Sequence, residues 1–340
     1  MPITIKDIAK RTGVNHSTVS RALHGSNLIS VETAERIRKA AREMGYQPSA
    51  AARSLKTRRS KVLGVIVSSI EDPFFSEIVF GIEAVAQDNG YSLFIGSSQH
   101  DNQRERKIVQ TMLEHRTDGV IVCSSSFSVE HGRQLLDHGF PIVVVNHQAT
   151  ENFHYSIFHD DIDGSRQVTR HLIGLGHQRI AYLGNSVSGR TTLDRLSGFQ
   201  AEMEAAGLPI PEGYIQHVPG GTALEGREGL QHFNGVAEFP TAIICYNDMI
   251  AIGLLQACRE AGIHVPQDLS ITGFDNISFS AFTHPPLTTF DQPKSSIGAE
   301  AARLLFELID AEQKVTPGTQ YVKILKGSLL VRSSTAAVLP

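Results

Sequence analysis

The stretch TIKDIAKRTGVNHSTVSRALHG, residues 4–25, reads as two short helices separated by a glycine turn. Thr4 is a candidate N-cap of the first helix, because Asp7 follows three residues later in the pattern of a capping box. Gly13 stops that helix, and Asn15 can cap the next one. Helix, glycine-containing turn and helix together are the layout of a helix-turn-helix motif.

A third helix is expected directly downstream, from the candidate N-cap Ser30 to Gly45. Apolar residues in all three predicted helices recur at spacings of three and four, which predicts one small shared core. These residues are Ile5, Ile8, Ala9, Val19, Ala22, Leu23, Val31, Ala34, Ile37, Ala41 and Met44. The first 47 residues are therefore expected to form one all-helical domain.

The charge of the chain changes sign after this part. Residues 1–61 hold 13 Lys and Arg against 4 Asp and Glu, whereas the remaining residues hold 18 against 31. The pI of about 6.4 for the whole chain hides this split. A basic module joined to an acidic body suggests that the module meets a polyanion and that the body does something else.

The second predicted helix would expose a polar face that suits the major groove of DNA. Arg21 is the natural reader of guanine on this face, because a guanidinium can donate two hydrogen bonds to one guanine edge. The exposed polar residues are His16, Ser17, Ser20, Arg21 and His24. Charge and helical pattern alone fit a small helical domain with a solvated basic face equally well.

The segment SAAARSLKTRR, residues 49–59, follows Pro48, which breaks the third helix. It predicts a helix of about two turns, too short to be stable alone in water. Such a basic, marginal helix can fold on DNA. Leu55 would then enter a minor-groove base step as a wedge, with Arg53 and Lys56 near the backbone. The alternative is a linker with an incidental leucine.

Residues 61–340 alternate between strand-like apolar runs and amphipathic segments. This alternation predicts parallel sheets with helices on both faces, and two series of runs predict two doubly wound lobes. The strand-like runs cover residues 62–67, 91–96, 119–124, 141–146, 155–160, 179–184, 241–247, 269–275 and 286–292. The amphipathic segments cover residues 75–89, 103–116, 163–175, 193–206, 224–234 and 248–261.

Polar and aromatic residues follow several of the predicted strands, where ligands of parallel sheets bind. Carboxylates can accept hydrogen bonds from adjacent hydroxyls of a polyol, arginine and amides serve the others, and aromatic rings cover C–H faces. Such residue types are present at Asp72, Phe74, Phe75, Asn146, Arg195, Asn247, Asp275 and Gln292. The pattern predicts a ligand site between the lobes.

Each of these residues also has a purely structural interpretation. Asn247 and Asp275 can cap the segments that follow them, and Phe74 can pack at the interface between the lobes. Arg195 can pair with a structural acid. A lone histidine such as His147, which follows Asn146, is more often structural than ligand-binding.

The helix-turn-helix motif with TVSRAL, the YQPSAAARSLKTRRSKVLGVIV junction and the C-terminal blocks ITGFD and TTFDQ resemble the LacI/GalR family of bacterial transcription regulators. The resemblance covers essentially the whole chain. It implies an N-terminal all-α helix-turn-helix domain with a hinge helix. An α/β body with parallel sheets follows, two-lobed and like type I periplasmic binding proteins.

The resemblance implies roles for individual residues. His16 and Ser17 fall where the family chooses the operator sequence, and Arg21 matches a strongly shared arginine. Leu55 matches the intercalating leucine of the hinge. Phosphate contacts fall on Thr4, Thr18 and Ser20, and effector contacts on Arg195, Asn247 and Asp275, with Phe74 and Gln292 as further candidates. Asn15 departs from the serine that is usual there, but asparagine also caps helices.

The resemblance also implies domain boundaries. Residues 1–47 would form the DNA-binding domain, residues 48–60 the hinge, and residues 61–340 the effector-binding and dimerisation domain. The chain would cross between lobes three times, and a helix from about residue 293 to 314 would join the first lobe. Lobe one is expected over about 61–162 and 292–318, and lobe two over about 163–291 and 319–340.

The resulting expectation is a cytoplasmic, homodimeric repressor that binds double-stranded DNA at a palindromic operator and responds to a small molecule, with a carbohydrate favoured. Asp275 beside Arg195 favours a neutral sugar or its monophosphate over a simple anion, and a purine is another option in the family. The alternatives are a corepressor or a protein partner, such as one that reports carbon status. A free sugar-binding protein is disfavoured by the N-terminal module.

Other classes find no support in the sequence. There is no nucleophile elbow, no dinucleotide or phosphate-binding glycine fingerprint, and no histidine or cysteine spacing for a metal. An enzyme, a metal site and a cofactor are therefore not expected. No apolar run approaches the length that spans a bilayer, and the N-terminus does not resemble a signal peptide. The three cysteines, Cys123, Cys245 and Cys258, are expected to be buried and unpaired.

Overall fold

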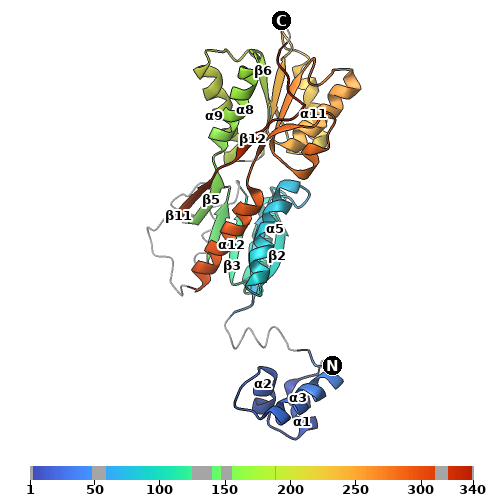
Figure 1. The fold of residues 1–340 in the computed structure, drawn as a ribbon, viewed down its shortest axis with the longest axis vertical. Helices are drawn as coiled ribbons and strands as arrows, with labels where there is room; N and C mark the ends of the chain where they lie inside the picture. The colour runs from blue at the N-terminus through green and yellow to red at the C-terminus, as the bar shows by residue number, and fades with distance from the viewer. Residues whose placement is uncertain are drawn as a thin grey trace. The chain divides into compact units, whose positions relative to one another are not determined.

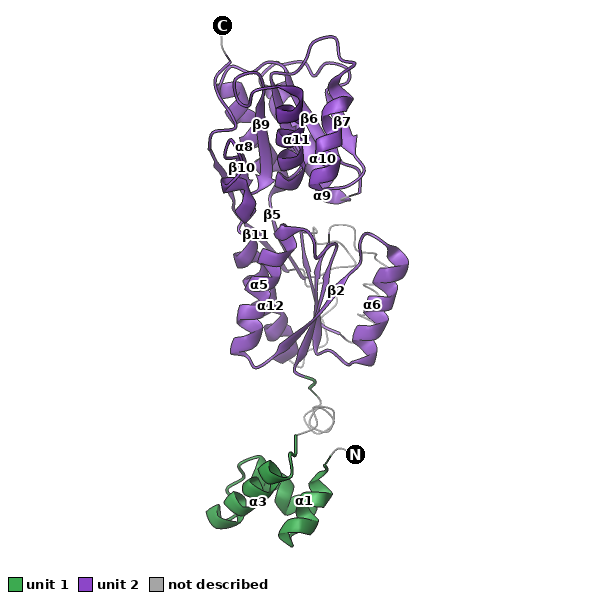
Figure 2. Cartoon of the chain, turned by 90° about the vertical axis from the view of Figure 1, so that its right-hand side faces the viewer, with its two compact units in different colours: residues 1–60 green, residues 61–340 purple. Residues whose placement is uncertain are grey.

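The structure is a computed structural model that describes residues 3–47, 59–124, 140–146, 155–187, 189–310 and 321–338. The chain divides into two compact units, residues 1–60 and residues 61–340 (Figure 2). The expected hinge helix with Arg53, Leu55 and Lys56 lies outside the described residues, as does His147. Cys123, Cys245 and Cys258 are buried and free, as predicted.

The first unit contains the three predicted helices, α1 (Ile5–Thr12), α2 (His16–Leu23) and α3 (Val31–Glu43). Their shared core is confirmed, because the apolar faces of the helices bury one cluster of side chains. The most buried members of this cluster are Ile8, Val19, Ala22 and Ile37. One prediction about the core is wrong: Val31, the first residue of α3, is 76% exposed.

Capping explains where these helices begin. The carboxylate of Asp7 accepts hydrogen bonds from the Thr4 backbone N–H at 2.9 Å and from the Thr4 hydroxyl at 2.7 Å. Ser30 accepts a hydrogen bond from the Thr33 N–H at the start of α3. Asn15 occupies the N-cap position of α2 with an extended backbone, as predicted. Its side chain, however, makes no capping hydrogen bond.

The second unit contains two six-stranded sheets, one in each lobe (Figure 1). The first sheet has the order β11-β5-β4-β3-β1-β2 and the second the order β12-β10-β9-β8-β6-β7, and only β12 pairs antiparallel. The first sheet consists of β1 (Val62–Val67), β2 (Ser92–Ser97), β3 (Gly119–Cys123), β4 (Ile142–Val145), β5 (Tyr155–His159) and β11 (Tyr321–Leu325). The second consists of β6 (Ile180–Asn185), β7 (Ile215–Val218), β8 (Ala242–Cys245), β9 (Ser270–Asp275), β10 (Thr288–Asp291) and β12 (Ser328–Leu330).

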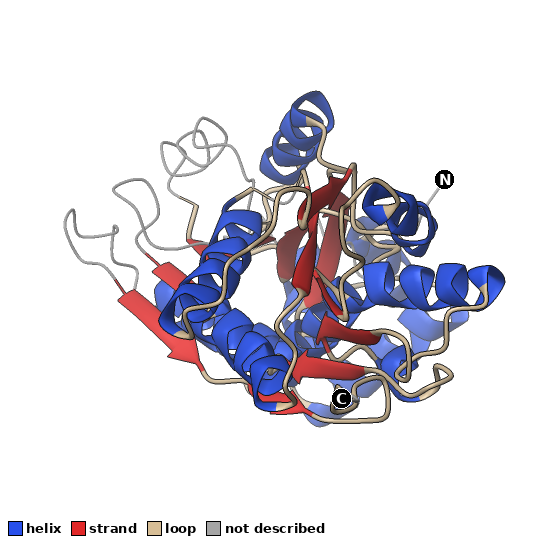
Figure 3. Cartoon of the chain, turned by 90° about the horizontal axis from the view of Figure 1, so that it is seen from above, coloured by secondary structure: helices blue, strands red, loops and turns tan. Residues whose placement is uncertain are grey.

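Helices cover both faces of each sheet (Figure 3). Helices α5 and α12 pack against each other in the first lobe, and the pairs α8 with α9 and α10 with α11 do so in the second. The bounds are α5 (Pro73–Asp88), α6 (Asn102–Glu114), α8 (Asp161–Gly174), α9 (Arg190–Ala205), α10 (Ala223–Gly229), α11 (Asp248–Ala261) and α12 (Lys294–Asp310). Two short 3-10 helices, η1 (Leu230–Phe233) and η2 (Ser278–Ala281), complete the second lobe.

Strand β1 shows why both faces are covered. Its residues Leu63, Val65 and Val67 point to the core under α5 and α12, whereas Ile66 joins the core under α6. Successive side chains of a strand point to opposite faces, so an uninterrupted apolar run is stable only when both faces are buried.

The chain crosses between lobes three times, after β5, after β10 and after β11. The expected lobe boundary at residue 318 is wrong, because β11 pairs with β5 and extends the first lobe to Leu325. Strand β11 lies at the edge of its sheet with Tyr321, Val322 and Ile324 partly exposed, and its sequence YVKIL mixes apolar and charged residues. An edge strand of this kind gives no strong apolar signal.

Helices α5 and α12 approach closely because each has a glycine at the crossing point. A Cβ added at Gly81 would overlap the backbone carbonyl oxygen of Ser295, and one added at Gly298 would overlap that of Ile78. Backbone atoms cannot move aside as the end of a flexible side chain can.

Gly81→Ala is therefore expected to lower the free energy of unfolding by about 2 kcal/mol through overpacking. Gly174, in helix α8, has open space around it. Gly174→Ala should leave stability unchanged or raise it by up to about 1 kcal/mol. Urea unfolding of both variants measures this, and equal effects of the two substitutions would contradict the packing argument.

Candidate functional site

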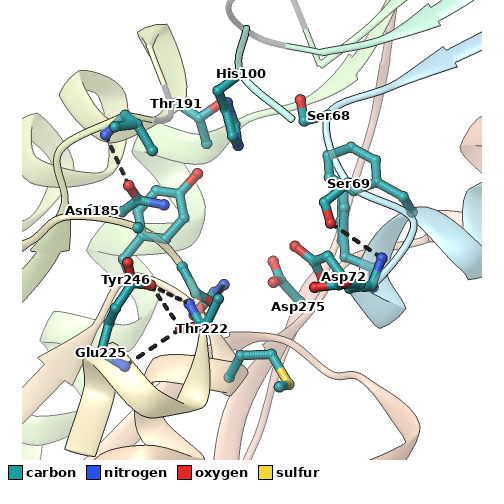
Figure 4. Close-up of a pocket in the computed structure, with 18 of the residues that line it drawn as sticks. Ser68, Ser69, Asp72, His100, Asn185, Thr191, Thr222, Glu225, Tyr246 and Asp275 are labelled. Carbon is teal, nitrogen blue, oxygen red and sulfur yellow. Dashed lines mark hydrogen bonds between the residues drawn. The ribbon is translucent and has the colours of Figure 1, made fainter. Parts of the chain in front are cut away.

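A cleft of about 560 Å³ lies between the two lobes (Figure 4). The lining residues lie at or beyond the carboxyl ends of β1, β2, β4, β6, β7, β8 and β9, or at the starts of the following helices, as expected for a ligand site of parallel sheets. The first lobe contributes Ser68, Ser69, Glu71, Asp72, Phe74, Phe75, Gln99, His100 and Asn146. The second contributes Asn185, Val187, Thr191, Arg195, Pro219, Gly220, Gly221, Thr222, Glu225, Tyr246, Asn247, Met249 and Asp275.

The structure brings seven of the eight predicted effector-contact residues to this cleft. The exception is Gln292, which is 1% exposed and lies behind the lining. Its Nε2 donates a hydrogen bond to Asp275 Oδ1 at 2.5 Å. The amide thus supports the carboxylate of Asp275, and contact between Gln292 and the effector stays a prediction.

Arg195 is the central charge of the site. It is 4% exposed, and the central carbon of its guanidinium lies over the rings of Tyr246 and Phe274, 4.5 Å and 3.9 Å from their centroids. Its Nε donates to Asp161 at 2.7 Å and its Nη1 to the Tyr246 carbonyl at 2.5 Å. Its Nη2 reaches Asp275 Oδ1 at 3.5 Å. Arg195 thus pairs with a structural acid, Asp161, as its structural interpretation predicted, and it also lines the cleft.

Asp161 is the first residue of α8, directly after the first crossing between lobes. Burial raises the pKa of its carboxyl. The interactions of this carboxyl with the imidazole of His159 and the guanidinium of Arg195 outweigh burial and hold the pKa at about 2. The Nε2 of His159, at the end of β5, lies 3.1 Å from the Asp161 carboxylate. Asp161 therefore connects β5, the strand before the first crossing between lobes, to the site.

Asp275 ends β9 with an unusual backbone. Its φ of 114° lies in a region that residues with side chains rarely adopt, and such strain concentrates at functional sites. The buried Lys294 donates hydrogen bonds to the backbone carbonyls of Asp275 and Asn276. Burial raises the pKa of the Asp275 carboxyl well above its usual value, and the charge of Arg195 opposes this only in part.

Two of the predicted residues also serve as helix caps. Asp72 Oδ1 accepts a hydrogen bond from the Phe74 N–H at 3.0 Å at the start of α5. Asn247 Oδ1 accepts one from the Ile250 N–H at 2.8 Å at the start of α11, and its Nδ2 donates to the Gly221 carbonyl. The capping alternative thus holds for Asn247, and both side chains line the cleft as well.

The two phenylalanines differ in exposure. Phe74 is 6% exposed and packs in the core of the first lobe, whereas its structural interpretation placed it at the interface between the lobes. The ring of Phe75 meets that of Phe74 edge-on, with centroids 5.2 Å apart. Phe75 is only partly buried, so it offers the larger apolar surface to the cleft.

Sequence reasoning missed several residues of the lining. Thr222 and Glu225 form a capping box that the spacing T-x-x-E could have revealed. Asn185 directly follows the strand-like run 179–184, and Tyr246 lies near the end of the run 241–247, so the rule that ligands bind at strand ends could have found both. His100 carried no pattern, and burial lowers its pKa.

Asp248 lies beneath the cleft beside Asn247. It is fully buried and accepts hydrogen bonds from the Thr289 hydroxyl and from the Ile277 N–H. Burial raises its pKa from 3.8 to about 7, although these hydrogen bonds oppose the shift. Gly273 allows this approach, because a Cβ there would overlap the Asp248 carboxylate.

The predicted DNA-contacting face of α2 points away from the core of the first unit. His16, Ser17, Arg21 and His24 are exposed, whereas Val19 and Ala22 are buried. Thr18 and Ser20 are half-buried, and Thr4 is exposed. Within the described part of the chain, no group of His, Cys, Asp and Glu could hold a metal ion, and no helix is long and apolar enough to cross a membrane.

A helix-turn-helix unit and a two-lobed α/β unit with a cleft at its strand ends define the class of ligand-sensing DNA-binding regulators. Residues 4–49 match the family described as bacterial regulatory proteins, lacI family. Residues 169–335 match the periplasmic binding protein-like domain.

Relatives of known function cover nearly the whole chain. The HTH-type transcriptional repressor PurR of Pasteurella multocida is 35% identical over 316 residues, which cover 92% of this chain and 93% of that protein. The HTH-type transcriptional repressor CytR of Escherichia coli is 35% identical over 340 residues, 98% and 97% of the two chains. This chain therefore belongs to the LacI family, and it is a DNA-binding transcriptional regulator, as the resemblance implied.

Solved structures agree with the fold. The lac repressor dimer bound to operator and the anti-inducer ONPF matches with a TM-score of 0.86 and 26% identity, covering 99% of this chain and 100% of that chain. The transcriptional regulator CelR in complex with cellobiose matches with a TM-score of 0.73 and 26% identity, over 98% and 99% of the chains.

The raised pKa of Asp248 predicts that stability falls as the pH rises. The folded state keeps a proton that the unfolded chain has already lost, so this stabilisation is full below about pH 4 and is lost as the pH passes 7. The free energy of unfolding should fall by up to about 1.4 kcal/mol per pH unit from this group.

Asp248→Asn should reduce that slope between about pH 4 and 7, as measured by urea unfolding at each pH. Asp268→Asn is the control, because hydrogen bonds from His264 lower the pKa of this exposed carboxyl and its titration lies below that range. Identical slopes in wild type and Asp248→Asn would show that Asp248 does not hold the proton.

Proposed function

We propose that this regulator is a repressor that binds a palindromic operator as a homodimer and changes its operator affinity when a small effector binds in the cleft. The observation that supports this best is the network of Arg195 with Asp161 and Asp275. This network is polar and lies where the chain first crosses between the lobes, which supports a ligand site there. A ligand that prefers one arrangement of the lobes shifts the population of that arrangement.

The proposed DNA contacts start from the exposed face of α2. His16, Ser17 and Arg21 would read base edges in the major groove, with His24 beside them. Thr4, Thr18 and Ser20 would contact phosphates. The hinge would fold on the operator, with Leu55 as a wedge in the minor groove and Arg53 and Lys56 near the backbone.

The proposed effector contacts are Gln292, which supports Asp275, and the lining residues Asp72, Phe74, Phe75, Asn146, Arg195, Asn247 and Asp275. A carbohydrate suits this set, because carboxylates and amides accept hydroxyl hydrogen bonds and an aromatic ring covers an apolar face. The similar regulator CelR was solved with cellobiose, which supports a ligand of this kind.

Exposed apolar side chains of the second unit support a homodimer. Phe80 on α5 is 66% exposed, Leu224 on α10 is 63% exposed, and Phe279 and Phe282 are 58% and 86% exposed. Large apolar side chains exposed to water are candidates for burial in an interface. The similar lac repressor binds its operator as a dimer. A regulator that binds the chromosome would reside in the cytoplasm.

Selection of bound sequences from random duplex DNA by the full chain tests the proposal. Wild type should enrich a two-fold symmetric sequence, because a symmetric dimer reads two half-sites. Arg21→Ala should lose base preference at one or two positions in each half-site, a loss of about 1–3 kcal/mol.

Arg38→Ala is the matched control, since Arg38 is an equally exposed arginine on α3 and should leave the base preference unchanged. An enriched sequence without two-fold symmetry would contradict the dimer. A uniform loss of affinity for all DNA in Arg21→Ala would make Arg21 a phosphate contact only.

A further inference from the structure

Helix α12 extends from the second crossing between lobes toward the far end of the first lobe. Its 17 residues correspond to a length of about 26 Å, because an α-helix rises about 1.5 Å per residue. Figure 1 shows α12 beside α5, the helix against which it packs. Lys294 begins the helix close to Asp275, and Phe306 lies in its last two turns. Contacts at the two ends of α12 therefore belong to opposite ends of the lobe.

The cleft end of α12 is held by a buried cation. Lys294 is 3% exposed, and its Nζ donates to the backbone carbonyl of Asp275 and, at 3.0 Å, to that of Asn276. The same Nζ lies 3.4 Å from Glu77 Oε2 on α5 and 3.8 Å from Asp291 Oδ1. Glu77 does not line the cleft. One ammonium thus joins the backbone of a cleft residue to both helices of the pair.

The far end of α12 contacts the place where the chain enters the first lobe. The ring of Phe306 meets that of Tyr91 edge-on, with centroids 4.9 Å apart. The ammonium of Lys61 lies 4.3 Å from the centroid of Tyr91, and the Lys61 N–H donates to Asp118 Oδ2 at 3.1 Å. Lys61 is the first residue of the second unit and directly follows residues 48–60, the proposed hinge. Two side-chain contacts therefore join α12 to the start of the lobe.

Between these ends, α5 and α12 are packed backbone to backbone. A Cβ added at Gly81 would overlap the carbonyl oxygen of Ser295, and one added at Gly298 would overlap that of Ile78. A contact of this kind has no flexible side chain that could absorb a displacement, and close-packed interiors transmit strain. A displacement at Lys294 should therefore be carried by both helices to their far ends.

We infer that the packed pair of α5 and α12 couples the cleft to the entry of the hinge, and that Glu77, Tyr91 and Lys61 are positioning residues of this response. A ligand that moves the backbone of Asp275 acts through Lys294 on the helix pair. The helix pair in turn acts on the contact between Lys61 and Tyr91. This inference deepens the proposed function and rests on it, since the cleft must control operator affinity for the coupling to matter.

Contact along a route does not measure coupling, so the test is a double-mutant cycle on operator affinity. The full chain is compared as wild type, Glu77→Gln, Lys61→Met and the double variant. Fluorescence anisotropy gives the Kd of each for the operator duplex that wild type selects from random DNA, so no effector is needed. Glu77→Gln should change the Kd by at least about threefold, and the double variant should differ from the product of the single changes by at least about threefold.

Glu77→Gln is expected to fold, because Asp291 still compensates the charge of Lys294. Urea unfolding of each variant checks this. Lys107→Met is the matched control, because it removes the charge of an exposed lysine on α6 of the same lobe. Its effect should multiply with that of Glu77→Gln, since distant sites without shared partners act independently. Tyr91→Leu should reproduce the effect of Lys61→Met in the cycle, because it removes the ring between Lys61 and α12.

Three results would overturn the coupling. They are an unchanged Kd in Glu77→Gln, a double variant within about twofold of the product of the single changes, and an equal deviation in the cycle with Lys107→Met. Failure of the proposed function would look different. If wild type selects no duplex from random DNA, the regulator itself is refuted before any variant is compared, and this inference falls with it.

Discussion

The buried guanidinium of Arg195 is the interaction on which the site depends. A buried charge is costly unless it is paired and hydrogen-bonded, and Asp161 and Asp275 both pair with this guanidinium. Asp161 begins the helix after the first crossing between lobes, and Asp275 ends a central strand of the second lobe. Loss of either carboxylate would leave a buried charge with less compensation, so these three residues fix one another in place.

A second buried cation, Lys294, contacts both lobes at the second crossing, between β10 and α12. Lys294, at the start of α12, donates to the backbone carbonyls of Asp275 and Asn276 and lies 3.4 Å from Glu77 on α5 of the first lobe. The backbone of Asp275 is thus tied to both crossings that flank the cleft. A ligand that bonds to this carboxylate acts on the segment where the angle between lobes is set. Effector control of DNA binding requires that the ligand prefer one such arrangement, and typical coupling free energies are about 1–3 kcal/mol.

Sequence reasoning predicted the elements that are buried on both faces. All nine predicted strand-like runs form strands. Eight of them lie inside their sheets, where buried parallel strands need uninterrupted apolar sequence, and the ninth, β2, lies at an edge. The strands that it missed, β7, β11 and β12, lie at sheet edges, where partial exposure permits polar residues. For the site, the rule that ligands bind at strand ends predicted eight residues, and seven of them line the cleft. The rule could not show that the amide of Gln292 bonds to Asp275 and does not line the cleft, because an amide at a strand end suits either position.

The central claim is that a ligand in the cleft controls operator affinity. The most direct measurement is the affinity of a cleft-binding ligand for the full chain, free and bound to its selected operator, in wild type and Asp275→Asn. Because coupling between two binding sites is reciprocal, the ligand affinity should change by the same factor as the operator affinity, about 5- to 150-fold. Asp275→Asn should bind the operator normally and lose the response. Equal ligand affinity for free and operator-bound protein would contradict the account.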